Sequence, residues 1–127
     1  MEEKPQKNAA ATPEGEFPVF DRASLMEQVM GDEPMARRLI EVFKGDTPGQ
    51  ITLLKNYLAA GDALNVAQRA HNIRGSSAIV GAQALSALAN AMEQAGKEGD
   101  MAFVSARMAD LDAQFDRLKE VITIDIL

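Results

Sequence analysis

A regular spacing of large apolar residues near the C-terminus constrains the fold of this chain more than any other feature of its sequence. Six of them follow one another at alternating intervals of four and three residues: Val104, Met108, Leu111, Phe115, Leu118 and Ile122. This spacing puts all six side chains on one face of an α-helix, as in the seam of a helical bundle. Only the stretch VITIDIL at 121–127 shows the alternation of a β-strand, and the pattern does not decide its state.

Aspartates that follow turns are candidate caps for further helices. We expect Asp21 to cap a short helix that ends near Gly31, and Asp32 to cap a second helix. The second helix has apolar residues at helical spacing: Met35, Leu39, Val42 and Phe43, then Ile51, Leu54 and Leu58. The stretch GDTPGQ at 45–50 interrupts this pattern, either as a restart or as a kink in one long helix.

The dipeptide Gly-Asp stands at Gly61–Asp62 and again at Gly99–Asp100, where a glycine would end one helix and an aspartate begin the next. These breaks predict a third helix over about 62–78, a fourth over about 82–98 and a last one after 100. Long amphipathic helices with short connections favour antiparallel neighbours. We therefore predict an all-α fold, an antiparallel up-down four-helix bundle with an additional short N-terminal helix.

Composition indicates the domain organisation and disfavours several classes of function. Residues 1–16 are polar and rich in alanine and proline, so we expect a disordered lead or linker there and one domain over 17–127. The chain has no cysteine and one histidine, which excludes disulfides and disfavours a zinc site. A net charge of −6 disfavours nucleic acid binding, and no apolar run reaches membrane-spanning length. We expect a cytoplasmic protein that binds neither nucleic acid nor membrane, and no metal.

The single histidine, His71, lies in the third predicted helix, four residues before Gly75. A helical wheel places the core stripe of this helix on one side: Val66, Ala70, Ile73, Ser77 and Val80. His71 falls well away from this stripe and is expected to be exposed. The residues that share its side are small or polar, apart from one leucine: Leu64, Ala67, Gln68, Arg74, Gly75 and Ala78. Ser76 falls on a flank.

The small neighbours predict that another protein can approach the imidazole closely, most of all at Gly75. Arg74 can reach an anion that is bound at the ring. Neutral imidazole is available near pH 7, and an exposed imidazole beside a cation suits a phosphoryl group that is taken up and passed on. The alternative is structural: a surface histidine without a role, and a glycine at a close helix–helix contact.

The stretch AHNIRGSSAIVGAQALSALANAMEQAG at 70–96 resembles the signature of histidine-containing phosphotransfer (HPt) domains. The resemblance implies that His71 accepts the phosphoryl group. It implies that Arg74, at a position more often occupied by lysine, stabilises the phosphate charge. Gly81 would form the turn into the fourth helix. Some members support the histidine with a glutamine of that helix, whereas Glu93 stands here and could bind the ring, pair with Arg74 or repel a phosphate.

Further residues complete the predicted site. The approach of a partner is assigned to Gly75, Ala67, Ala78 and Gln68, and a supporting role to Ser76 beside Gly81 and Glu93.

By this resemblance the protein is a phosphorelay intermediate. It would take a phosphoryl group from an aspartate of a response-regulator receiver domain and pass it to another receiver, as a module of or partner to a hybrid sensor histidine kinase. Mg²⁺ would sit on the receiver, and this chain, expected to be a monomer, would bind no cofactor. The sequence has no ATP-binding motif, so we expect no autokinase activity.

Three alternatives stay open. A chemotaxis-kinase-type phosphotransfer domain would be phosphorylated by a kinase domain and not by a receiver. A helical adaptor would use none of this chemistry. An enzyme that works through its carboxylates is disfavoured, because the acidic residues show no converging pair.

Overall fold

The computed structural model describes residues 16–126, so the predicted lead over 1–16 lies almost wholly outside the described residues. Its described part contains helices and no strand, which confirms the all-α prediction. In chain order the helices are α1 (Arg22–Gln28), α2 (Glu33–Ala59), α3 (Ala63–Ile79), α4 (Gln83–Lys97) and α5 (Met101–Ile126).

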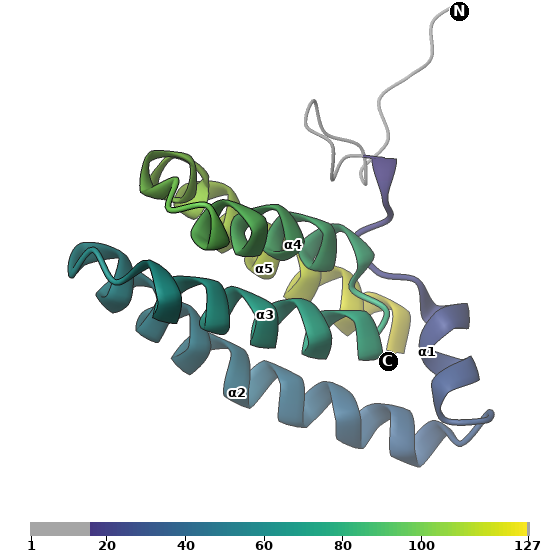
Figure 1. Ribbon diagram of the computed structural model, residues 1–127. Helices are drawn as coiled ribbons and strands as arrows, with labels where there is room; N and C mark the ends of the chain where they lie inside the picture. The colour runs from purple at the N-terminus through teal and green to yellow at the C-terminus, as the bar shows by residue number, and fades with distance from the viewer. Residues whose placement is uncertain (1–15, 127) are drawn as a thin grey trace, which may run out of the picture.

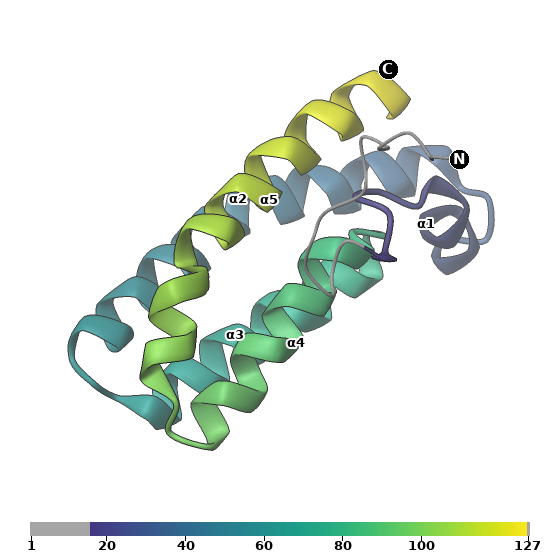
Figure 2. The same ribbon diagram turned by 90° about the horizontal axis from the view of Figure 1, so that it is seen from above.

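The four long helices run alternately up and down (Figure 1). α3 packs between α2 and α4, and α5 packs against both α4 and α2 and so closes the bundle (Figure 2). The short helix α1 lies at one end, beside the turn that joins α3 to α4. The predicted antiparallel four-helix bundle with an additional N-terminal helix is confirmed.

Four aspartates cap the helices as the sequence predicts. Side-chain oxygens of Asp21, Asp32, Asp62 and Asp100 accept hydrogen bonds from the backbone N–H three residues further on, at 3.1 to 3.2 Å. A cap of this kind contributes about 1 kcal/mol. The glycines before the last two caps have φ values of 70° and 76°, which let the chain leave one helix and enter the next.

The second predicted helix is one continuous helix of 27 residues with Pro48 inside it, so the stretch at 45–50 does not restart a helix. Its buried stripe is Ala36, Ile40, Phe43, Thr47, Ile51 and Leu54. The apolar spacing was misleading at Met35 and Val42, whose side chains are exposed. Each of these two precedes a stripe residue by one position and is therefore rotated by about 100° from the core.

The core joins α2 to α5 across the bundle. The rings of Phe43 and Phe115 meet edge to face with their centroids 6.0 Å apart. Five of the six seam residues of α5 are buried, and Met108 is partly buried. At the surface of the same helix pair, Lys55 Nζ lies 2.9 Å from Asp112 Oδ2. The helix continues to Ile126, so the tail is helical as far as the structure describes it.

Gly81 anchors the N-terminal segment to the turn between α3 and α4. Its φ is 82°, and its carbonyl accepts a hydrogen bond of 2.8 Å from the Asp21 N–H. A Cβ at Gly81 would lie 2.5 Å from the Asp21 carbonyl oxygen, so only glycine fits there. Gly81 thus forms the turn into α4, and its role is in the fold, away from the imidazole.

Candidate functional site

His71 lies in the middle of α3, and half of its side chain is exposed. The whole core stripe that the wheel predicts for this helix is buried. Gln68 and Ala78 are exposed, and Arg74 and Gly75 are partly exposed. The predicted orientation of the histidine is therefore confirmed.

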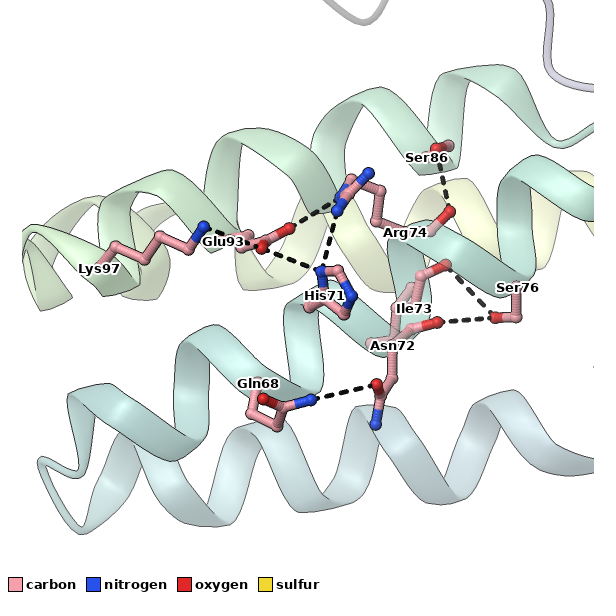
Figure 3. A network of polar contacts seen from close by, with 9 residues as sticks. All are labelled: Gln68, His71, Asn72, Ile73, Arg74, Ser76, Ser86, Glu93 and Lys97. Carbon is pink, nitrogen blue, oxygen red and sulfur yellow. Dashed lines mark hydrogen bonds and ion pairs between the residues drawn. The ribbon is translucent and has the colours of Figure 1, made fainter.

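The imidazole belongs to a polar network centred on Glu93 of α4 (Figure 3). Glu93 Oε2 lies 3.0 Å from His71 Nδ1, and Glu93 Oε1 accepts a hydrogen bond of 2.7 Å from Arg74 Nε. Lys97 Nζ lies 3.3 Å from Oε2. Arg74 Nη2 is also 2.8 Å from His71 Nδ1. Both contacts that we considered for Glu93, with the ring and with Arg74, are present.

Glu93 is a buried carboxylate with several donors around it; only 4 % of its side chain is exposed. Burial by itself would raise its pKa. The hydrogen bonds from Arg74, His71 and Lys97, with the charge of Arg74, outweigh burial and hold the pKa of Glu93 below its usual value. Glu93 is therefore ionised at neutral pH and can only accept hydrogen bonds.

The two contacts at His71 Nδ1 exclude each other. Nδ1 donates to Glu93 when it carries a proton, and accepts from Arg74 when it does not. In the neutral ring bound to Glu93 the proton is on Nδ1, and Nε2 keeps its lone pair. Nε2 has no hydrogen-bond partner among residues 16–126. The Glu93-bound state thus presents an unprotonated nitrogen for nucleophilic attack.

Ala67 does not belong to the exposed face, contrary to the wheel. It is buried at the contact between α3 and α4. The reason is Gly96 of α4: a Cβ there would lie 3.0 Å from the Ala67 backbone nitrogen. The missing side chain lets α4 come close enough to cover Ala67, which is consequently not open to a partner.

The remaining predicted site residues make no hydrogen bond to the imidazole within the part of the chain that the structure describes. Gly75 faces open space, since a Cβ there would meet nothing within 4 Å. Gln68 donates to the Asn72 side chain at 3.4 Å, and the Ser76 hydroxyl donates to backbone carbonyls one turn earlier in its own helix. Ala78 lines a shallow hollow on the α4 side of Arg74.

A groove of about 460 Å³ runs between α2 and α3 beside the imidazole. His71 and Gly75 line it from α3, and Val42 lines it from α2. Val42 is 52 % exposed, and Ile79, which lines the same groove from α3, is 48 % exposed. Sequence reasoning missed this apolar wall because it took the apolar residues of α2 for a single face.

Sequence reasoning also missed Lys97. Its signal was available, because Lys97 follows Glu93 by four residues and so lies on the same face of α4. In the part of the chain that the structure describes, no cluster of three or more His, Asp or Glu side chains could hold a metal ion. No helix there is long and apolar enough to cross a membrane.

The sequence matches the family model of the Hpt domain over residues 38–121, which include the whole network around His71. No curated protein matches the chain. The fold is similar to the crystal structure of histidine-containing phosphotransfer protein B (HptB) from Pseudomonas aeruginosa PAO1, with a TM-score of 0.79 and 22% identity over 86% of this chain and 95% of that one. At this identity the likeness shows a common fold, and the family match covers well over half of the chain. The chain belongs to the Hpt domain family, the histidine-containing phosphotransfer domains of two-component signalling.

Proposed function

We propose that Nε2 of His71 takes a phosphoryl group from the phospho-aspartate of a response-regulator receiver domain and passes it to a second receiver. The Nε2 lone pair attacks phosphorus, the bond between phosphorus and the aspartate oxygen breaks, and the aspartate leaves as a carboxylate. The second transfer is the reverse of this step on another receiver. The protein is thus a carrier, as a module of or partner to a hybrid sensor histidine kinase.

The contact of 3.0 Å between His71 Nδ1 and Glu93 Oε2 is the observation that carries this proposal. When the bond to phosphorus forms at Nε2, the ring gains positive charge. A carboxylate bound to the Nδ1–H offsets that charge and also fixes the plane of the ring. Glu93 can do both because it is buried and sits on a helix.

Arg74 supplies the second charge of the site. Its guanidinium lies next to the ring and is partly exposed, so it can turn towards phosphoryl oxygens at Nε2. Mg²⁺ and most of the remaining charge stabilisation in the transition state would come from the acidic pocket of the receiver.

The groove between α2 and α3 supports docking of the receiver next to His71. Its exposed apolar residues, Val42 of α2 and Ile79 of α3, line the groove together with Gly75. Apolar side chains grouped at a surface in this way are typical of protein interaction sites.

The test is to incubate the protein with a receiver domain that has been charged with acetyl phosphate. We expect one added phosphoryl group that is acid-labile, alkali-stable and located on His71 by peptide mapping. His71→Gln should fold normally, with a stability within about 1 kcal/mol of the parent, and accept no phosphoryl group. Phosphate on His71→Gln would contradict the proposal.

The same assay separates the alternatives. A chemotaxis-kinase-type domain would be loaded by a kinase domain with ATP and not by a charged receiver, and an adaptor by neither. It stays a prediction that the protein works with a hybrid sensor kinase, that it is a monomer and that it is cytoplasmic.

A further inference from the structure

The proposed reaction needs the Arg74 guanidinium at the phosphoryl group, whereas in this structure it contacts Glu93 and His71 Nδ1. In this structure its Nε donates to Glu93 Oε1 and its Nη2 lies 2.8 Å from His71 Nδ1. The phosphoryl group would bind at Nε2, on the opposite edge of the ring. For Arg74 to contact phosphoryl oxygens, its guanidinium must leave the Nδ1 side and give up at least part of its contact with Glu93.

Glu93 would then lose its shortest polar contact while it stays buried. A buried carboxylate without a cationic partner is strongly disfavoured, and it either takes up a proton or moves towards water. In either case it would no longer hold the Nδ1–H of His71. The reacting ring would lose its support at the moment when it gains positive charge.

Lys97 is placed to prevent this. Among the described residues, the ionisable groups that contact Glu93 are His71 and Arg74 of α3 and Lys97 of α4. Lys97 Nζ lies 3.3 Å from Oε2, the same oxygen that faces His71 Nδ1, and a carboxylate oxygen can accept both bonds. The lysine comes from the last turn of α4, and 58 % of its side chain is exposed, so its ammonium can close on Oε2 without a change in the bundle (Figure 3).

We propose that Lys97 is a positioning residue that keeps the Glu93 carboxylate charged and in place while Arg74 turns to the phosphoryl group. The hydrogen bond from His71 Nδ1 to Glu93 thereby persists through transfer, and Nε2 stays the reactive nitrogen. This inference rests on the proposed function of His71.

The first test follows the proton on the imidazole. His71 is the only histidine of the chain, so ¹⁵N-labelled histidine gives the signals of one ring, and their shifts report which nitrogen is protonated. The spectra are recorded above the pH at which the ring signals stop changing, so that only the two neutral tautomers contribute. Arg74→Met imitates an arginine that has turned away, and it should keep the proton on Nδ1.

Adding Lys97→Met to Arg74→Met should change the ratio of the two tautomers about fivefold in favour of the proton on Nε2. Arg74→Met with Lys97→Arg should restore the ratio of Arg74→Met alone. The same ratio with and without Lys97→Met would overturn the inference, whether or not any phosphoryl transfer occurs.

The second test measures transfer from a charged receiver in proteins that keep Arg74. Lys97→Met should be about fivefold slower than wild type, and Lys97→Arg should have close to the wild-type rate. Lys55→Met is the matched control, because it also removes a lysine from an ion pair but between α2 and α5; its rate should not change. Normal transfer in Lys97→Met would overturn the inference and leave the proposed function intact, whereas no phosphoryl group on wild-type His71 would count against the proposed function.

Discussion

At His71 the two ring nitrogens have different surroundings, and this difference decides which of them can react. Nδ1 faces Glu93 and Arg74, and Nε2 points away from both. An amide at position 93 could donate or accept and would tolerate either tautomer. A carboxylate can only accept, so it selects the tautomer with a proton on Nδ1 and a lone pair on Nε2. Glu93 in place of a glutamine is therefore consistent with a nucleophilic histidine.

A substitution at Gly75 can separate the access of a receiver to His71 from the stability of the fold. A Cβ there meets nothing within 4 Å, so Gly75→Lys replaces a poor helix former by a good one and should raise the free energy of unfolding by about 0.5–1 kcal/mol. The same lysine would project beside the imidazole and slow transfer from a charged receiver at least about tenfold, since 1.4 kcal/mol of lost docking suffices for that. Urea denaturation and transfer rates measure the two effects.

Phosphoramidate, a small phosphoryl donor that needs no docking, provides the control for Gly75→Lys. We expect it to load His71 in this variant and in wild type at similar rates. An unchanged rate from the receiver would show that the open face at Gly75 plays no part in access.

At the scale of the helices, the sequence predicts those features that depend on residues close together in the chain. The aspartate caps and the seam of α5 depend on residues within one or two turns, and both agree with the structure. The predicted buried face of α2 was partly wrong, because neighbouring apolar residues such as Val42 and Phe43 cannot both point inward. The predicted exposure of Ala67 was wrong for another reason. Its burial depends on how closely α4 approaches α3, and the sequence pattern of α3 alone does not contain this information.

Gly96 tests that close approach. In a helix interior, glycine to alanine normally stabilises by about 1 kcal/mol. At Gly96 the added Cβ would lie 3.0 Å from backbone of α3 at Ala67, so we expect Gly96→Ala to destabilise the fold by about 1–2 kcal/mol. Gly49→Ala in α2, where a Cβ meets nothing within 4 Å, should stabilise instead. Urea denaturation of both variants decides, and stabilisation by both would contradict the close contact.

At the scale of the whole molecule, the fold and the site depend on the same contact between α3 and α4. The exposure of His71 follows from the pattern of one helix, and the wheel predicts it. The hydrogen-bond partner of Nδ1 cannot be predicted from one helix. Glu93 lies 22 residues further along the chain and meets the ring only when α3 and α4 pack in the correct register. The turn at Gly81 and the close approach at Gly96 set that register.

The network around Glu93 should therefore appear in the stability of the entire bundle as a function of pH. In the folded protein the pKa of Glu93 lies below its ordinary value of 4.5. The unfolded chain thus binds more protons on this group in the acid range, so the network stabilises the fold above pH 4.5 and this stabilisation is lost as pH falls through the lowered pKa of Glu93. Glu93→Gln should be less stable than wild type by about 2 kcal/mol at pH 7, because charged hydrogen bonds to Arg74 and His71 are lost.

Below pH 4.5 the free energies of unfolding of wild type and Glu93→Gln should converge, because protonation removes from wild type the carboxylate charge that the substitution has already removed. Urea denaturation of both proteins between about pH 3 and pH 7 measures the difference at each pH. A difference that stays constant over this range would mean that the carboxylate of Glu93 does not connect α3 to α4 through its charge. A difference that narrows only in the acid range would link the group that orients His71 to the stability of the bundle that carries it.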